Sequence, residues 1–231
     1  EENSNNLIQI AADGTVIRAG AITGLPVNIY SSGDIDNNGN YYVQEDGSSS
    51  IIYQIDIAAR TATIINLSQS IVVNDFAYNI TNDLMYSVMQ SGADAGTLLT
   101  IDVTTGTVNT IGSTNSLNLF GAMYASSTGD IYGNLNTGGF YQFNTLTGER
   151  TLISTSSSAL HNDGAHCVTA PIMFESNLSV TKTDGTTTYV PGTDTTYTIV
   201  ASNNGPFGVL DASVTDTPTG IPAANISYSA V

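Results

Sequence analysis

The sequence predicts an all-β protein in which a β-propeller-like domain of repeated four-stranded blades is followed by a partial Ig-like β-sandwich. Two observations lead to this prediction. A strand–turn–strand pattern recurs over residues 1–174 with a period near 45 residues, and a different strand pattern begins at residue 175. A fixed period of this length, with no helical pattern inside the unit, is typical of stacked β-sheets such as propeller blades.

One half of the repeat unit is a hairpin that occurs four times, with two short apolar runs around a polar turn. The copies are Leu7–Gly20, Ser50–Leu67, Thr97–Gly112 and Gly139–Ser154. Within them Ile10, Ile55, Ile101 and Phe143 align at separations of 45, 46 and 42 residues. We expect these four side chains to be buried at equivalent positions, because an apolar position that recurs in every unit belongs to the core face of a strand.

The other half of the unit is a second hairpin that occurs three times. The copies are Asp34–Val43, Phe76–Val88 and Ala122–Asn134. They align Tyr42, Tyr86 and Tyr132 at separations of 44 and 46 residues, and we expect these rings to be at least partly buried. Two hairpins supply four strands, which is the content of one propeller blade.

The first unit lacks this leading hairpin. A candidate for it follows the last unit, at Asp163–Met173. If the two ends of the domain shared one blade, the ring would close and its exposed sheet edges would disappear. The alternative is that the chain begins inside a longer propeller, and the sequence leaves both arrangements open.

Residues 175–231 show the alternation of half-buried strands. Leu178 and Val180 begin a first strand, Tyr197 and Ile199 a second, and Val209–Val214 a third. These strands fit the opening half of a β-sandwich. Because an Ig-like sandwich needs about seven strands and about 100 residues, we expect this domain to be truncated at its C-terminal end and the natural protein to continue.

Composition excludes several classes of partner. Four basic residues face twenty acidic ones, giving a formal net charge of −16. A chain this acidic repels nucleic acid and anionic membranes. It has no apolar run long enough for a membrane span, so we expect no membrane insertion in this segment. Only 10% of the residues are charged, against about 25% in average proteins. This composition favours a secreted protein or a surface protein.

The chain has one cysteine, Cys167, so it contains no disulfide framework. We expect Cys167 to be buried as a small apolar residue. His166 is adjacent, but neighbouring side chains of a strand point to opposite faces, which argues against a Cys–His catalytic pair.

The one local motif with a chemical interpretation is Asp34–Asn40, with Glu45 at the twelfth position. It satisfies the pattern of a calcium-binding loop, in which Asp34, Asp36, Asn38 and the Asn40 carbonyl would supply oxygen ligands. No helices are expected to flank it. Two interpretations stay open, a calcium loop within a hairpin or an ordinary turn in which Asp and Asn side chains bond their own backbone. No cofactor other than calcium is predicted.

The segment after residue 177 resembles the Ig-like domain-of-unknown-function-eleven family of bacterial surface proteins. The resemblance rests on Leu178-x-Val180-x-Lys182, on Val190-Pro191-Gly192 with Tyr197 and Ile199, on Asn203–Pro206, and on Val214–Thr217. The upstream part resembles a propeller-like domain that often precedes such repeats, with its closing motif at Asn162–Cys167. The resemblance implies stalks and adhesins, further Ig-like repeats in the same chain, and no catalytic residues.

These observations favour a non-enzymatic extracellular protein, either an adhesin or a component of a surface filament, with a propeller head and an Ig-like stalk. The expected ligand of the head is a surface glycan or a protein. One alternative is a structural subunit of an extracellular fibre without a ligand. Another is a carbohydrate-active enzyme built on a propeller. It would need a convergent cluster of His, Arg, Tyr and acid at one mouth, which is hard to build with the three arginines and two histidines of this domain.

Overall fold

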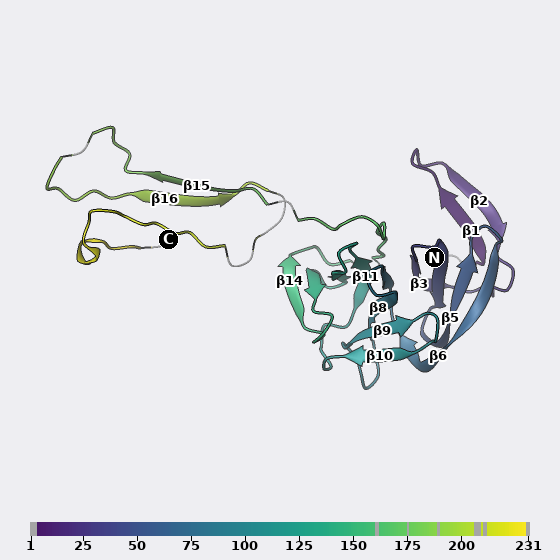
Figure 1. The fold of residues 1–231 in the computed structure, drawn as a ribbon. Coiled ribbons are helices and arrows are strands. Elements are labelled where there is room, and N and C mark those ends of the chain that lie inside the picture. The colour runs from purple at the N-terminus through teal and green to yellow at the C-terminus, as the bar shows by residue number, and fades with distance from the viewer. Residues whose placement is uncertain are drawn as a thin grey trace. The chain divides into compact units, whose positions relative to one another are not determined.

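The computed structural model describes residues 4–159, 162–174, 176–188, 190–205, 209 and 212–229. The chain divides into two compact units, residues 1–173 and residues 174–231. Strands make up almost all of the regular structure, and the one helical element among the described residues is a single 3₁₀ turn, Ala223–Asn225. Figure 1 shows the strands in chain order.

The first unit contains three four-stranded antiparallel sheets of the same topology. In each sheet consecutive strands are neighbours. The first sheet consists of β3 (Tyr30–Ile35), β4 (Asn40–Glu45), β5 (Ser48–Asp56) and β6 (Thr61–Val72). The second consists of β7 (Phe76–Asn79), β8 (Leu84–Val88), β9 (Leu98–Asp102) and β10 (Val108–Ile111). The third consists of β11 (Phe120–Ala125), β12 (Ile131–Leu135), β13 (Phe140–Phe143) and β14 (Arg150–Ser154).

The three sheets pack like propeller blades. The first strand of the second sheet, β7, contacts both β3 and β11, which are the first strands of its two neighbours. The last strands β6 and β10 also meet. Successive sheets therefore lie face to face, with their first strands gathered at a common centre (Figure 1). The predicted four-stranded units are confirmed.

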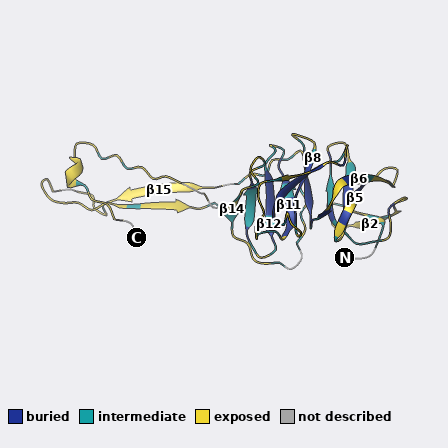
Figure 2. Cartoon of the chain, turned by 90° about the horizontal axis from the view of Figure 1, so that it is seen from below, coloured by how far each residue is buried: buried dark blue, intermediate teal, exposed yellow. Residues whose placement is uncertain are grey.

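Hydrophobic side chains fill the spaces between the sheets. One cluster joins the first sheet to the second and includes Ile52, Phe76 and Ile101, and another joins the second sheet to the third and includes Leu98 and Phe120. Figure 2 shows this burial on β8, β11 and β12. Burial of this kind contributes roughly 1.5–3 kcal/mol for each large side chain, so the space between sheets is the core.

In the three complete sheets, the aligned apolar residues are buried as predicted. Ile55, Ile101 and Phe143 are 1%, 0% and 3% exposed. The three aligned tyrosines are buried as well, at Tyr42, Tyr86 and Tyr132. Both predictions are confirmed at these positions.

The prediction for Ile10 was wrong, because this side chain is 70% exposed. Ile10 ends β1 (Asn6–Ile10), which pairs with β2 (Val16–Ala21) in a two-stranded sheet. The residues expected to supply the leading hairpin of this sheet, Asp163–Met173, form no strand. Without that hairpin, the position that is core in the other sheets faces solvent.

Residues 162–172 instead follow the third sheet as an irregular segment. Asn162 Nδ2 donates to Asn136 Oδ1 at 2.8 Å, and further along the backbone N–H of Ile172 donates to Ser126 Oγ at 3.0 Å. The backbone N–H of Ser127 also donates to the carbonyl of Ala170 at 3.0 Å. The segment thus runs beside β11 without joining a sheet.

The second unit contains one hairpin, formed by β15 (Leu178–Thr183) and β16 (Thr198–Asn203). These are the first two strands predicted for this region. The third was not found, because residue 209 and residues 212–214 are not in a strand. No described residue of 174–229 is buried, so the described residues do not show an Ig-like sandwich. Pro206, part of the resembling motif, lies outside the described residues.

Candidate functional site

The turn between β3 and β4 holds most of the predicted calcium ligands. Asp36 Oδ1 accepts hydrogen bonds from the backbone N–H groups of Asn38 and Asn40, both at 2.9 Å. Asp36 Oδ2 accepts from Asn40 Nδ2 at 2.8 Å and from the hydroxyl of Tyr42 at 3.2 Å. Gly39 has a φ of 84°, which closes the turn at a conformation that glycine adopts without strain. Asp36 therefore organises its own turn.

Hydrogen bonding also sets the charge of Asp36. Burial acts to raise the pKa of this carboxyl, but the bonds from Asn40, Asn38 and Tyr42 outweigh it and hold the pKa below its ordinary value. Asp36 is thus a carboxylate at neutral pH, satisfied by four protein donors. The Asn40 carbonyl accepts from the N–H of Asp36 at 3.0 Å.

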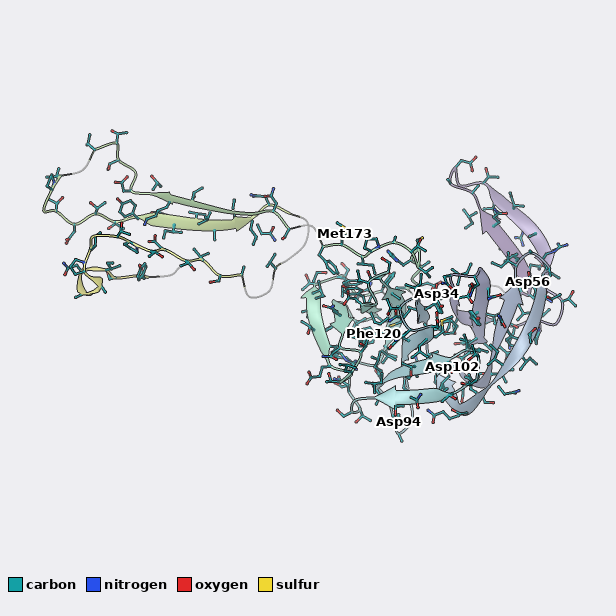
Figure 3. All side chains as sticks on the ribbon, viewed as in Figure 1. Asp34, Asp56, Asp94, Asp102, Phe120 and Met173 are labelled. Carbon is teal, nitrogen blue, oxygen red and sulfur yellow. The ribbon has the colours of Figure 1, made fainter. Side chains whose placement is uncertain are left out.

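Asp34, the first predicted ligand, points to the neighbouring sheet. Its Oδ2 accepts the backbone N–H of Tyr78 in β7 at 2.6 Å, and its Oδ1 accepts the N–H of Ile35 at 2.8 Å. Figure 3 marks Asp34 among the side chains. Glu45 accepts from the hydroxyl of Tyr53 at 3.1 Å. The structure thus brings Asp36, Asn38 and Asn40 together in one turn and uses Asp34 and Glu45 elsewhere.

Asn79 and Ser126 occupy the equivalent turn position in the other two sheets, and each accepts a hydrogen bond from its own turn. Asn79 Oδ1 accepts the N–H of Thr81 at 2.9 Å, and Ser126 Oγ accepts the N–H of Thr128 at 3.4 Å. A residue that bonds its own turn in every repeat favours the turn interpretation. Calcium binding at Asp36 would have to replace several of its hydrogen bonds, and it stays a prediction.

Sequence reasoning missed Asp75, which is fully buried between the second and third sheets. Its Oδ2 accepts the backbone N–H of Met123 in β11 at 2.7 Å, and its Oδ1 accepts the N–H of Phe76 at 2.8 Å. Asp75 thus does for the second and third sheets what Asp34 does for the first and second. The available signal was an acid between the apolar residues Val73 and Phe76.

Asp34 and Asp75 belong to an acidic cluster, defined here as these two residues with Asp163, Tyr41 and Tyr124. Burial raises the pKa of Asp75 to about 8, with the charges of Asp163 and Asp34 adding to the shift. Burial likewise raises the pKa of Asp34 to about 6. Burial, together with the charges of all three acids, raises the pKa of the Tyr41 hydroxyl to about 12.

In the described part of the chain, the side chains of Asp34 and Asp75 accept hydrogen bonds from backbone N–H groups and not from a basic side chain. Three of the chain's four cations are engaged elsewhere, Arg60 with the carbonyl of Ala19, Arg150 with the rings of Phe120 and Phe143, and Lys182 with Asp216. An acid that is buried without a counter-charge is stabilised as the neutral form. Protonation is therefore the expected state of Asp75 at neutral pH.

Cys167 is exposed, so the prediction of a buried thiol was wrong. The segment around it is irregular, and the neighbouring Val168 takes the buried position instead. Cys167 Sγ lies 3.3 Å from Thr169 Oγ1. Hydrogen bonding from Thr169 lowers the pKa of the thiol.

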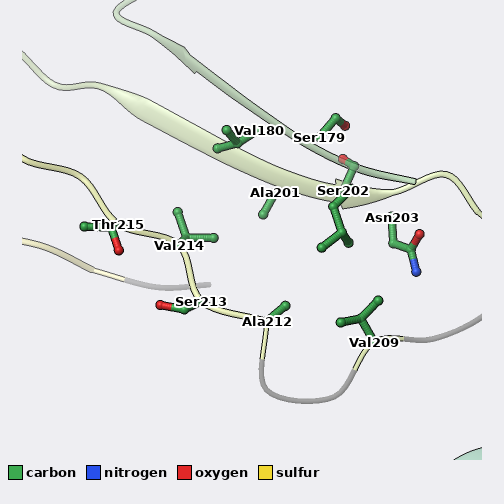
Figure 4. A pocket seen from close by; sticks show the side chains of 11 residues that line it. Ser179, Val180, Ala201, Ser202, Asn203, Val209, Ala212, Ser213, Val214 and Thr215 are labelled. Carbon is green, nitrogen blue, oxygen red and sulfur yellow. The ribbon is translucent and has the colours of Figure 1, made fainter. Parts of the chain in front are cut away.

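A cavity of about 420 Å³ lies in the second unit, between the β15–β16 hairpin and the chain around residues 209–215 (Figure 4). Its lining is largely apolar. The residues are Leu178, Ser179, Val180, Ala201, Ser202, Asn203, Val209, Ala212, Ser213, Val214 and Thr215. Leu178 and Val180 are 55% and 61% exposed, so this is an open face of the hairpin.

Two further searches of the described residues concern metals and membranes. They hold no group of three or more His, Cys, Asp or Glu side chains arranged to bind a metal ion. None of their helices has the length and hydropathy needed to cross a bilayer.

Comparison with solved structures gives distant similarities. Virginiamycin B lyase from Staphylococcus aureus is 10% identical, with a TM-score of 0.44, over 71% of this chain and 54% of the lyase. An auxiliary nutrient binding protein from Bacteroides ovatus is 14% identical, with a TM-score of 0.48, over 89% of this chain and 53% of that protein. The chain thus spans about half the length of either structure. With TM-scores below 0.5, these similarities carry no functional argument.

Comparison at the level of sequence is more decisive. A search of curated proteins gave no match. One family model, described as a repeat of unknown function (DUF6923), matches residues 1–169, which include all three four-stranded sheets and the β1–β2 hairpin. Because this match covers well over half of the sequence, the chain belongs to the DUF6923 repeat family.

Proposed function

We propose that this chain is a non-catalytic module of the bacterial cell surface, in which the propeller-like unit is a recognition head or a spacer. The observation that carries the proposal is that three aspartates that could take part in chemistry make structural hydrogen bonds instead. Asp34, Asp36 and Asp75 are each bonded to backbone N–H groups of their own turn or of the next sheet. Such acids hold a scaffold together.

Charge and composition support the same proposal. A net charge of −16 disfavours nucleic acid and anionic membranes as partners. Surfaces rich in Asn, Ser and Thr can bond sugar hydroxyls or a protein partner, so we propose a surface glycan or a protein as the ligand class.

In this proposal, residues 175–231 belong to an Ig-like repeat of the stalk. The support is the resemblance of the segment to such repeats, the β15–β16 hairpin at the expected place and the open apolar face beside it. In a two-layer sandwich Leu178 and Val180 would face the second sheet, where burial of large aliphatic side chains stabilises the fold.

The enzyme alternative draws on Asp75, because strongly shifted pKa values cluster at active sites. Asp75 is 0% exposed, however, and a general acid must come within hydrogen-bond reach of its substrate. The observations therefore favour a binding role over a catalytic one.

Two measurements test the proposal. Antibodies raised against the chain should label intact cells of the source organism, and labelling that requires permeabilised cells would contradict a surface location. The purified chain, labelled at the exposed Cys167, should bind a subset of immobilised glycans or extracellular proteins saturably. Release of products from any bound glycan would instead establish the enzyme.

A further inference from the structure

Three neighbouring polar side chains of the first sheet have buried atoms without a protein partner. Gln44 of β4 is 0% exposed and Ser32 of β3 is 3% exposed. In the described part of the chain, both amide atoms of Gln44 and the hydroxyl of Ser32 have no hydrogen-bond partner, and the buried hydroxyl of Ser31 has none either. A buried amide that is left unbonded carries the full cost of its desolvation, so a further partner is expected here.

Ser32 and Gln44 face each other across β3 and β4. They are a Cα pair of the antiparallel ladder, which places their Cβ atoms about 4.5–5.5 Å apart on the same face of the sheet. Neither side chain bonds the other. At this separation, one small molecule can bond both side chains.

The Ser32–Gln44 pair faces the second sheet. Asp34, two residues after Ser32, bonds the backbone of Tyr78 in β7. Tyr42, two residues before Gln44, belongs to the cluster that joins the first sheet to the second. Since side chains two residues apart on a strand share a face, Ser32 and Gln44 lie in the closed space between the two sheets.

The interface between the second and third sheets solves the same position differently. Counting from the aligned tyrosines of β4 and β8, Ser32 corresponds to Asp75 and Gln44 to Val88. The carboxyl of Asp75 crosses to the third sheet and accepts the N–H of Met123, while Val88 has no polar group to satisfy. The hydroxyl of Ser32 is shorter than that carboxyl, and Gln44 adds an amide. The first interface therefore needs a polar group that the second does not.

We propose that Ser32 and Gln44 hold an internal water molecule between the first and second sheets. Buried waters typically make about three hydrogen bonds, and the Ser32 hydroxyl with the oxygen and nitrogen of the Gln44 amide offers three polar atoms, including donors and acceptors. Both side chains are neutral, which favours water over an ion. Because the site is closed to solvent, this water leaves only when the two sheets separate. The site is independent of the function proposed above.

Oxygen-17 relaxation dispersion of the solvent tests the proposal, because it detects whole water molecules held inside the tumbling protein and is insensitive to exchange of hydroxyl protons. We expect Gln44→Met, which removes the amide and keeps a side chain of similar length, to lower the dispersion amplitude by that of one water per chain. Ser49→Ala is the matched control. Ser49 is also a buried serine of the first sheet, but its hydroxyl donates to the carbonyl of Ile51 at 2.9 Å, so the amplitude should stay unchanged.

A double variant asks whether the two side chains share one water. Ser32→Ala combined with Gln44→Met should lower the amplitude no further than Gln44→Met alone. Circular dichroism checks that each variant folds, and Gln44→Leu replaces Gln44→Met if that variant does not. An unchanged amplitude in the folded Gln44 variant, an equal loss in Ser49→Ala, a further loss in the double variant, or a crystal structure in which Gln44 bonds Ser32 directly would overturn the proposal.

Discussion

Single carboxylates connect neighbouring sheets in this protein. Asp34 bonds the backbone of β7 and Asp75 bonds the backbone of β11. Asp34 is half-buried and Asp75 is fully buried, and both have raised pKa values, near 6 and near 8. A structural role and an unusual titration therefore coincide in the same two residues.

The raised pKa values predict that stability falls as pH rises from about 5 to about 8. A carboxyl whose pKa is higher in the folded state than the ordinary value near 3.9 binds more protons when folded, so its contribution is fully present below that value and is lost as pH rises through the folded pKa. The slope is at most about 1.4 kcal/mol per pH unit for Asp75. Thermal unfolding measured at pH 5 and at pH 8 checks the sign.

Asp75→Asn identifies the residue responsible. The amide cannot ionise, so we expect the variant to lose much of the difference in melting temperature between pH 5 and pH 8. Asp94→Asn, at an exposed acid, removes a carboxyl group from the surface and should keep that difference. Equal behaviour of the two variants would attribute the pH dependence to net charge alone.

Substitution of a single residue, Asp36, can test the calcium hypothesis. If the turn binds calcium, added calcium should raise the melting temperature by mass action, and Asp36→Ala should abolish the increase. If Asp36 only organises the turn, Asp36→Ala should cost about 1–3 kcal/mol, the penalty for lost hydrogen bonds to a charged group, with or without calcium. Calorimetry with calcium and with a chelator separates the two outcomes.

At the scale of the strand, one aligned position has opposite environments in different sheets. Ile101 is 0% exposed and Ile10 is 70% exposed. Ile101→Ala should lower the free energy of unfolding by about 2–5 kcal/mol, as truncation in a packed core does. Ile10→Ala should change it by less than about 0.5 kcal/mol. Chemical denaturation of both variants checks this, and equal losses would contradict the assigned environments.

Two glycines in outer turns, Gly106 and Gly14, provide a second matched pair of substitutions. Gly106 has a φ of 72°, and a Cβ there would lie 1.9 Å from the carbonyl oxygen of Asn66 in the first sheet. Gly14, in the turn of β1–β2, has a φ of 85° and open space around it. Gly14→Ala should cost about 1–2 kcal/mol from the left-handed conformation alone. Gly106→Ala should cost clearly more, because the two sheets must separate, and denaturant midpoints compare the two variants.

Sequence reasoning succeeded where local pattern and repetition coincide. The hairpins of the three complete sheets and their buried tyrosines follow from alternation and period, which are local properties. It failed at Ile10 and Cys167, whose burial depends on which segments lie beside them in space. Asp75 was missed for the same reason, since its partner Met123 is 48 residues away. The turn around Asp36 was found, but one pattern of Asp and Asn serves equally for a metal and for a turn.

At the scale of the whole molecule, the two units differ in how much side-chain surface they bury. The first contains three hydrophobic clusters between its sheets. The second has no buried residue among those described, and its apolar side chains at Leu178, Val180 and Val214 are between 54% and 61% exposed. Since buried apolar surface supplies most of folding stability, the first unit should hold most of the stability of the chain.

Trypsin can test this difference within one molecule, because the chain offers it only Arg18, Arg60, Arg150 and Lys182. Arg150 and Lys182 both lie in strands. Arg150 is packed over the rings of Phe120 and Phe143, whereas every residue of β15 around Lys182 is exposed. Cleavage of folded protein follows local opening, which is easiest where few contacts hold the strand. Limited digestion followed by mass spectrometry should therefore show cutting after Lys182 well before cutting after Arg150, and equal rates at the two bonds would show that the second unit is as stable as the first.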